Sequence, residues 1–356
     1  MTQSVVLRRP RFAAAPIRVL IVDDSAVARA ALSRMVAETD EFEVVAALDS
    51  ARRAIAWLST ASVDIVLLDI QMPGLDGIAA LPEVVSASGG ARVLIVSTLA
   101  GDGAEETVQA LALGAADTLA KPEIGALGRQ FGEVLIDKML RLGKIAPATV
   151  AEARERQSLR KVAEQKISCL AIGASTGGIH ALAEFFAALP KDFDPPILVT
   201  QHLPPVFMSF FADQLSTLSG RSARVAKGGE ALKRGDLLLA PGDRHLCVSR
   251  KGSAAKVVLV DSIAVSRCCP SVDPMFSSAG DTFGEGLTGI VLTGMGRDGE
   301  IGARAITEAG GTVIVQDAVS AAVWGMPGAV ARAGLASLIA PPAGLAGYVA
   351  RRGVAA

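Results

Sequence analysis

The feature of the sequence that most constrains the fold is an alternation of apolar runs with helical patterns. Residues 17–24 are a mostly apolar run, and in residues 25–39 apolar side chains recur at helical spacing. Similar runs, each with a helical pattern after it, cover 42–48, 63–70, 91–98 and 117–120. Apolar strands separated by helices predict a parallel sheet with helices on both faces. We therefore expect residues 17–140 to form a flavodoxin-like (βα)5 domain.

The second half has the same α/β character and follows a charged segment. Residues 141–166 lack a sustained apolar stripe and are expected to form a linker. Residues 167–352 are expected to form a doubly wound α/β domain with a mostly parallel sheet. An antiparallel excursion is expected within 236–260, where strand patterns follow one another without helices. The predicted strands are 167–173, 196–201, 236–240, 245–249, 256–260, 288–294 and 311–317, and the predicted helices are 179–189, 208–218, 271–283 and 299–310.

The composition excludes several classes of protein. The net charge of −1 gives no electrostatic case for a nucleic acid or an anionic membrane as partner. No apolar stretch reaches the roughly 18 residues of a membrane helix, and residues 1–16 are expected to be a disordered lead-in without a secretory signal. The four cysteines contain no C-x-x-C pair, which favours reduced thiols. These features predict a cytoplasmic protein with no membrane insertion.

Three carboxylates follow predicted strands of the first domain. Asp23 and Asp24 follow the first strand, and Asp69 lies near the end of the third. Since the carboxyl ends of parallel strands meet at one edge, these side chains are expected to form an oxygen-rich site suited to Mg²⁺. Thr98 and Lys121 end the fourth and fifth strands and would bind phosphoryl oxygens there. The alternatives are helix capping by Asp24 and a surface position for Lys121.

The first domain resembles the response-regulator receiver domain. The matching pieces are VDDSA (22–26), LLDIQMPGLDG (67–77), Thr98 and Lys121-Pro122. The resemblance implies that Asp69 is the phosphoacceptor and that Asp23, Asp24, Asp69 and the carbonyl of Gln71 bind the metal. It also implies that Thr98 and Lys121 contact the phosphate. Thr118 stands where receivers usually carry an aromatic residue that couples phosphorylation to output, so signal transfer is expected to use another surface.

Ser175 is the predicted nucleophile of the second domain. It lies in GASTGG (173–178), between a predicted strand and a predicted helix, with the spacing G-x-S-x-G. A serine on such a tight turn projects its hydroxyl from the sheet, and the following helix offers backbone N–H groups to a developing oxyanion. A phosphate-binding turn is the alternative, but the spacing G-x-G-x-x-G is absent.

A histidine and an aspartate are expected at the same edge as Ser175. Among the three histidines, His202 directly follows a predicted strand, whereas His180 lies within a helix and His245 begins a strand. His202 is therefore the predicted general base, with a purely structural histidine as the alternative. Asp298 lies in a glycine-containing turn and is predicted to orient His202, with capping of the next helix as the alternative. The chain order Ser, His, Asp differs from that of α/β-hydrolases, which disfavours an ordinary lipase.

Residues 167–350 resemble the catalytic domain of the CheB family, the chemotaxis-specific protein-glutamate methylesterases. The matching pieces are AIGASTGG, QHLPPVFMSFFADQL, LAPGDRH, PSVDPMF, VLTGMGRDG and WGMPGAV. The resemblance implies that Ser175 is the nucleophile, His202 the base and Asp298 its orienting acid. It places Thr176 and Met295 beside the oxyanion site and implies no cofactor for the esterase reaction. Arg267-Cys268-Cys269 departs from the family, which commonly has a more basic stretch there. This segment could contact the substrate, so the departure leaves receptor preference open and does not touch the chemistry.

The resemblance also implies substrates, partners and regulation. The expected reaction is hydrolysis of glutamate methyl esters on the cytoplasmic domains of methylated chemoreceptors, with deamidation of receptor glutamines as a second activity. A sensor histidine kinase is the implied phosphoryl donor. The unphosphorylated first domain is expected to cover the edge that carries Ser175, and phosphorylation of Asp69 to open it. Two alternatives are a non-catalytic adaptor and an esterase or amidase that acts on a small molecule.

Overall fold

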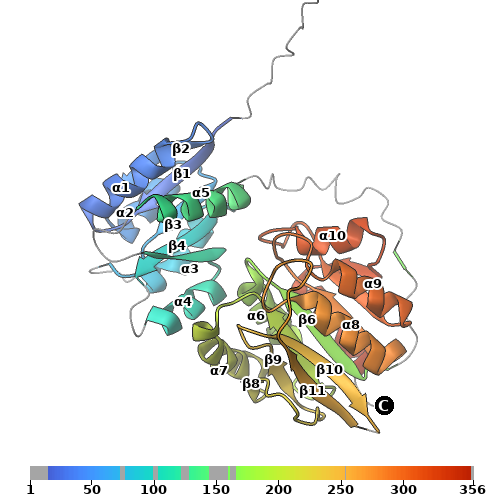
Figure 1. The fold of residues 1–356 in the computed structure, drawn as a ribbon. Coiled ribbons are helices and arrows are strands. Elements are labelled where there is room, and N and C mark those ends of the chain that lie inside the picture. Colours follow the sequence, from blue (N-terminus) through green and yellow to red (C-terminus); the bar gives the residue numbers. More distant parts are fainter. Residues whose placement is uncertain are drawn as a thin grey trace, which may run out of the picture.

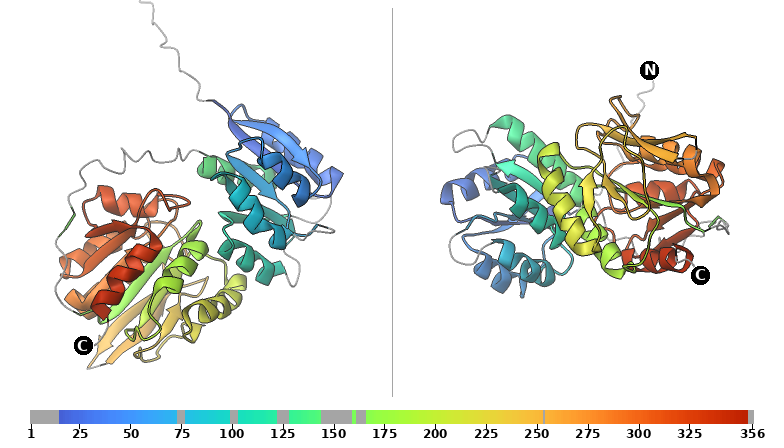
Figure 2. Two further views of the ribbon diagram at one scale, coloured as in Figure 1. Left: turned by 180° about the vertical axis from the view of Figure 1, so that it is seen from behind. Right: turned by 90° about the horizontal axis from the view of Figure 1, so that it is seen from below.

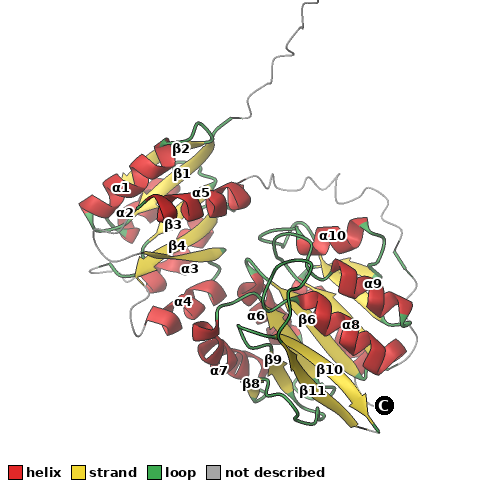
Figure 3. Cartoon of the chain, viewed as in Figure 1, coloured by secondary structure: helices red, strands yellow, loops and turns green. Residues whose placement is uncertain are grey.

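The chain folds into two α/β domains (Figures 1 and 3). The computed structural model describes residues 15–72, 77–98, 103–121, 128–143, 159–160, 166–252 and 254–353. Most of the predicted lead-in and linker therefore lies outside the described residues. Within the linker, the backbone N–H of Arg160 donates a hydrogen bond to the carbonyl of Ala336. None of the helices in the described ranges has the length and apolar character needed to cross a membrane.

The first domain is a five-stranded parallel sheet with the order β2-β1-β3-β4-β5, as expected for a flavodoxin-like fold. Its strands are β1 (Ile17–Val22), β2 (Phe42–Leu48), β3 (Ile65–Leu68), β4 (Arg92–Thr98) and β5 (Asp117–Lys121). Its helices are α1 (Ala26–Ala37), α2 (Ala51–Leu58), α3 (Gly77–Ala87), α4 (Gly103–Ala112) and α5 (Arg129–Gly143). Helix α5 runs past residue 140, where we had placed the end of the domain.

Buried apolar side chains alternate along the strands and hold helices against both faces of this sheet. Val19 and Ile21 of β1 share a core cluster with residues of α1 and α5. Leu20 and Val22 point to the other face and pack with α2, α3 and α4. The strands are apolar on both faces, which explains why helices cover both sides of this sheet, as predicted.

The second domain is built on a seven-stranded parallel sheet with the order β14-β13-β12-β6-β7-β9-β8. Its strands are β6 (Cys169–Ala174), β7 (Ile197–Gln201), β8 (Ala223–Val225), β9 (Leu237–Leu239), β12 (Leu287–Val291), β13 (Thr312–Gln316) and β14 (Leu338–Ala340). Its α-helices are α6 (Gly178–Ala188), α7 (Met208–Ser219), α8 (Val272–Phe283), α9 (Glu300–Glu308), α10 (Met326–Arg332) and α11 (Pro342–Gly353). Two short 3-10 helices are η2 (Pro205–Phe207) and η3 (Gly284–Gly286).

Both faces of the second sheet are covered, so the domain is doubly wound. Residues of α6, α7 and α11 cluster on one face, and residues of α8 and α10 pack on the other together with an antiparallel hairpin. The hairpin consists of β10 (His245–Lys251) and β11 (Ala254–Val260). The predicted antiparallel excursion is thus confined to this hairpin, because β9 joins the parallel sheet between β7 and β8.

The two domains meet along α4 of the first and α6 and α7 of the second (Figures 1 and 2). The backbone N–H of Gly177 donates to the carbonyl of Ala116 over 2.9 Å. Nδ1 of His180 on α6 is 2.8 Å from the carbonyl oxygen of Ala112 on α4. Because the first of these bonds is made two residues after Ser175, the first domain reaches the edge where the predicted nucleophile lies.

Candidate functional site

The acidic cluster of the first domain lies at the carboxyl ends of β1 and β3. Asp23 and Asp69 are buried, Asp24 is exposed, and the carboxylate oxygens of all three lie within 4.8 Å of one another. Nζ of Lys121, the last residue of β5, is 2.6 Å from Oδ2 of Asp23 and 2.5 Å from Oδ2 of Asp69. The structure therefore brings these four predicted residues together in one site.

Burial and ion pairing act in opposite directions in this cluster. Burial raises the pKa of Asp69, and the hydrogen bond and charge of Lys121 only partly offset the effect. Burial lowers the pKa of Lys121, but the two carboxylates outweigh it and raise that pKa above the usual value. The cluster thus pairs a protonated Lys121 with the carboxylates of Asp23 and Asp69.

The other two residues predicted for the first site are Gln71 and Thr98, of which the structure describes Thr98 only in part. The backbone N–H of Gln71 donates to Oδ1 of Asp69 over 3.0 Å, so the loop after β3 folds back on that carboxylate. Thr98 is the last residue of β4 and is the register partner of Lys121 on β5. Its side chain, like residues 73–76 and 122 of the receiver motifs, lies outside what the structure describes.

Ser175 lies on the sharp turn between β6 and α6. Its backbone N–H donates to the carbonyl of Thr293, which ties the turn to the segment after β12. Gly177 has a φ of +74°, and a Cβ atom at that position would lie 2.4 Å from Cβ of Ala322. Glycine is therefore required at this position for both conformation and space. At Gly294 space alone excludes a side chain, because a Cβ there would lie 2.4 Å from Sδ of Met326 and 2.8 Å from Cβ of Ser175.

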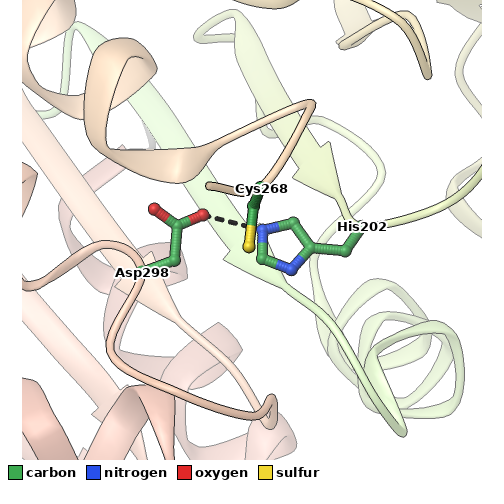
Figure 4. A group of neighbouring side chains, drawn as sticks. All are labelled: His202, Cys268 and Asp298. Carbon is green, nitrogen blue, oxygen red and sulfur yellow. Dashed lines mark hydrogen bonds and ion pairs between the residues drawn. The ribbon is translucent and has the colours of Figure 1, made fainter. Parts of the chain in front are cut away.

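The structure brings Ser175, His202 and Asp298 into one hydrogen-bonded line. His202 follows β7, and its Nδ1 lies 3.1 Å from Oγ of Ser175. Its Nε2 lies 2.7 Å from Oδ2 of Asp298, which follows β12 (Figure 4). The usual serine-protease arrangement uses the opposite nitrogens for these two contacts. The backbone N–H of His202 donates to the carbonyl of Ala174, which fixes the ring beside the Ser175 turn.

Asp298 is held by several donors besides His202. Oγ of Ser271 donates to Oδ1 over 2.7 Å, and the backbone N–H of Val272 donates to Oδ2 over 2.8 Å. The backbone N–H of Gly299 donates to Oδ1 over 3.1 Å. Because Asp298 is only 2 % exposed, these bonds compensate the desolvation of its carboxylate. Asp298 thus accepts donors from the N-terminal turn of α8 as well as from its own turn.

A second histidine, His245, accepts a hydrogen bond from Ser271. The backbone N–H of Ser271 donates to Nδ1 of His245 over 2.9 Å, and Nε2 of His245 lies 2.8 Å from the carbonyl of Ser262. With Nδ1 as acceptor, Nε2 must carry the proton that bonds to Ser262. His245 is completely buried, and sequence reasoning weighed it only as a rival base. Its position at the start of a strand and the nearby PSVD motif were the available signals for this supporting role.

The electrostatics of the line favour a protonated histidine beside an ionised aspartate. Burial lowers the pKa of His202, but hydrogen bonds and charges from Asp298 and Cys268 outweigh it and raise that pKa to about 9. Burial raises the pKa of Asp298, but its bonds to His202, Val272 and Ser271 hold it below the usual range. The ion pair can therefore stabilise an imidazolium, as a general base requires after it has taken a proton.

Thr176 and Met295, the predicted neighbours of an oxyanion, flank the Ser175 turn. The carbonyl of Thr176 accepts a bond from Oγ1 of Thr293, and Met295 follows Gly294, which packs against Ser175. Sδ of Met295 also accepts a long contact of 3.5 Å from Arg141 on α5. Both residues therefore lie at the junction between the turn and the segment after β12.

A cavity of about 420 Å³ opens onto Ser175 and His202, and the first domain forms part of its wall. The lining includes residues 116–120 and Lys138 from that domain. Thr118, which stands where receivers usually carry an aromatic residue, is among them. The candidate nucleophile therefore faces a space that the first domain partly encloses.

Two family models match the chain. Residues 170–349 match the model described as CheB methylesterase, and residues 19–127 match the response regulator receiver domain. The protein-glutamate methylesterase/protein-glutamine glutaminase 2 of Caulobacter vibrioides is 41% identical over 342 residues, covering 94% of this chain and 98% of that protein. A protein-glutamate methylesterase/protein-glutamine glutaminase 1 from Rhodospirillum rubrum is 38% identical, covering 94% of this chain and 95% of that protein. The crystal structure of the Thermotoga maritima CheB methylesterase catalytic domain matches with a TM-score of 0.51 and 34% identity, covering 52% of this chain and 98% of that domain.

Proposed function

The chain belongs to the CheB methylesterase family and carries a response regulator receiver domain, and we propose that it is a phosphorylation-controlled serine esterase acting on chemoreceptors. Its substrates are glutamate methyl esters on the cytoplasmic domains of methylated receptors, and it also deamidates receptor glutamines. This substrate implies a cytoplasmic location. The observation that carries the proposal is the line from Ser175 through His202 to Asp298 beside a cavity.

The reaction begins with proton transfer from Ser175 to His202. Nδ1 of His202 accepts the proton from Oγ, which attacks the side-chain carbonyl carbon of the glutamyl ester. The tetrahedral intermediate collapses as His202 returns the proton to the leaving oxygen, and methanol departs. Water then attacks the acyl-enzyme with His202 again as the base, which regenerates Ser175 and leaves a glutamate. With a glutamine substrate the same steps release ammonia.

Asp298 holds His202 in the tautomer that this reaction needs. Its Oδ2 accepts the Nε2–H bond, so the lone pair of the neutral ring is on Nδ1 and faces Ser175. The carboxylate then stabilises the imidazolium formed by proton transfer. For the oxyanion we assign the backbone N–H groups of Thr176 and Met295, which flank the Ser175 turn.

The receiver site supplies the control input. We assign Asp69 as the phosphoacceptor for a sensor histidine kinase, with Lys121 and Thr98 contacting the phosphoryl group. Three converging carboxylates provide the hard oxygen ligands that Mg²⁺ prefers, so Asp23, Asp24, Asp69 and the carbonyl of Gln71 would hold this ion. The bound ion would neutralise charge on the phosphoryl oxygens. The positions of α4 and β5 support inhibition of the unphosphorylated protein by its own receiver domain, released when Asp69 is phosphorylated.

Methanol release from methylated receptor membranes tests the proposal. Wild-type protein is expected to release methanol faster in the presence of acetyl phosphate, and Ser175→Ala protein is expected to release none under either condition. Activity toward free small esters without release from receptors would instead indicate a small-molecule esterase. An unchanged signalling output of Ser175→Ala protein in cells would indicate a non-catalytic adaptor.

A further inference from the structure

A cysteine lies within the group of side chains that contains His202 and Asp298. Figure 4 shows Cys268 beside the His202 ring, on the same side as the Asp298 carboxylate. Each of the three side chains offers one ligand atom, and these atoms all lie within 4.8 Å of one another. Cys268 precedes α8, whereas His202 follows β7 and Asp298 follows β12. Three loops that are distant in the sequence therefore bring sulfur, nitrogen and oxygen ligands to one point.

The set of ligands matches a thiophilic divalent ion. Zn²⁺ binds cysteine sulfur, histidine nitrogen and carboxylate oxygen at about 2.0–2.3 Å, usually in a tetrahedron. Such bonds separate neighbouring ligand atoms by roughly 3.3–3.7 Å, so small shifts of the side chains suffice here. The acidic cluster around Asp69 offers only oxygen ligands and suits harder ions such as Mg²⁺.

An entry path to this group of ligands is present. A cavity of about 460 Å³ is lined by Cys268 and Asp298 together with Met295 and Gly296. Cys268 is partly exposed, and its backbone N–H is anchored to Oγ of Ser266 over 3.3 Å. An ion could therefore reach Cys268 and Asp298 from this cavity, whereas His202 lines the neighbouring cavity at Ser175, which leaves space for a water molecule in the fourth position.

We propose that His202, Cys268 and Asp298 form a Zn²⁺ site whose occupation switches the esterase off. The ion displaces the proton of Nε2 to solvent and binds the lone pair left on that nitrogen, and the ring keeps one proton, which is on Nδ1. Nδ1 then donates to Ser175 instead of accepting its proton, so the serine has no base. Cys268 binds the ion as a thiolate, and any proton on its sulfur is released to solvent. The binding step stands on geometry alone, and only the inhibition rests on the proposed esterase function.

Binding is tested with Co²⁺ as a spectroscopic probe on the full-length, metal-stripped protein in buffer with excess Mg²⁺. A cobalt–thiolate bond gives a charge-transfer absorption that oxygen ligands of the receiver site do not produce. We expect this band in wild-type protein and in Cys269→Ala protein, which lacks only the neighbouring exposed thiol. We expect it to be lost in Cys268→Ala protein. A band of equal strength in Cys268→Ala protein would overturn the site.

Chemical protection provides a second test that needs no variant. Zn²⁺ is expected to slow alkylation of Cys268 by iodoacetamide in the wild-type protein, while Cys269 reacts at an unchanged rate, as read by mass spectrometry of the digested chain. Equal rates for Cys268 with and without Zn²⁺ would overturn the proposal even if Cys268→Ala protein failed to fold.

Inhibition is then measured as methanol release at increasing Zn²⁺, with each variant compared with its own metal-free rate. The Zn²⁺ concentration for half inhibition is expected to rise by at least about tenfold in Cys268→Ala protein and to stay unchanged in Cys269→Ala protein. Equal inhibition of wild-type and Cys268→Ala proteins would refute the switch. Failure of the esterase assay itself would leave the cobalt band and the protection of Cys268 unaffected, so the two proposals can fail separately.

Discussion

At the scale of single residues, the candidate site depends on the protonation states of His202 and Asp298. His202 is placed between a hydroxyl and a carboxylate. Asp298 accepts hydrogen bonds from four further donors, which belong to Ser271, Val272, Asp273 and Gly299. A carboxylate with this many donors stays ionised when it is buried, because each bond stabilises the charged form. The result is a histidine whose affinity for a proton is unusually high.

The pH dependence of the reaction follows from the pKa of His202. Because the protonated ring cannot accept the Ser175 proton, kcat/KM is expected to be low at acidic pH and to rise as pH passes through about 9. Replacing Asp298 with Asn removes one of the two groups that favour protonation of His202 and leaves Cys268 in place, so the pKa of His202 should move down from about 9 toward its ordinary value of about 6.5. The loss of tautomer control should also lower kcat by roughly 10⁴-fold. Titration of the ring protons by NMR and a pH–rate profile measure these effects, and a wild-type midpoint near neutrality would contradict them.

Ser271 is expected to act as a positioning residue for Asp298. Ser271→Ala removes a hydrogen bond to a buried carboxylate, which is worth about 1.5–3 kcal/mol. We expect kcat to fall by roughly 10- to 150-fold with little change in KM, and the pH–rate midpoint to stay near the wild-type value, because the other donors and His202 keep Asp298 ionised at that pH. Ser278→Ala removes a hydroxyl from α8 whose bonds go to Val248 and Met275 rather than to Ser271 or Asp298, and serves as the control. Equal kinetics for the two variants would show that the Ser271 bond does not support catalysis.

At the scale of elements, the β6–α6 turn depends on close packing against its neighbours. The turn passes beside the segment after β12 on one side and the first domain on the other, through bonds to the carbonyls of Thr293 and Ala116. Only a residue without a side chain fits at Gly177, because its φ is positive and the space is filled by Ala322. The geometry of the nucleophile is therefore set by packing around a glycine as well as by the serine itself.

A pair of glycine variants separates conformation from packing at this turn. Gly177→Ala and Gly229→Ala both place a side chain at a positive φ, which costs about 1–2 kcal/mol. A Cβ at Gly229 meets no atom within 4 Å, whereas a Cβ at Gly177 collides with Ala322. We expect Gly177→Ala to lower the calorimetric unfolding temperature more than Gly229→Ala and to abolish methanol release. Equal shifts for the two variants would mean that the collision is relieved at little cost.

At the scale of the whole molecule, the receiver domain lies against the esterase domain beside the nucleophile. Helix α4 packs on α6 and α7, and Arg92 of the first domain donates to the carbonyl of Ala321 of the second. The wall that β5 contributes to the cavity at Ser175 would obstruct a protein substrate more than a small one. The domain arrangement therefore fits an inhibited state of a protein-modifying enzyme.

Removal of the receiver domain is expected to release this inhibition. A fragment of residues 160–356 should release methanol from methylated receptors faster than the unphosphorylated full chain, by about 5- to 150-fold for a coupling of 1–3 kcal/mol. Acetyl phosphate should stimulate the full chain but neither the fragment nor Asp69→Ala protein. A fragment no faster than the unphosphorylated full chain would contradict inhibition by the receiver domain.

The sequence by itself determined the class of the fold and the residues that gather at each site. Apolar runs and helical spacing are local patterns, so they identified β6, β7, β12 and β13 and the helices between them without knowledge of the tertiary structure. Parallel strands place their carboxyl ends at one edge, and this rule predicts from the sequence that Ser175, His202 and Asp298 lie together. The three-residue strands β8 and β14 were missed, whereas β9, of the same length, was predicted from the apolar run in residues 236–240.

Only the tertiary structure decided how the side chains at those edges face one another. The choice of Nδ1 for Ser175 and Nε2 for Asp298, the support of Asp298 by Ser271 and His245, and the approach of Cys268 all depend on loops that are distant in the sequence. The contact of α4 with α6 likewise joins two separately folded units. Sequence periodicity reports which face of an element is buried, whereas the angles and distances between elements follow from packing of the complete chain.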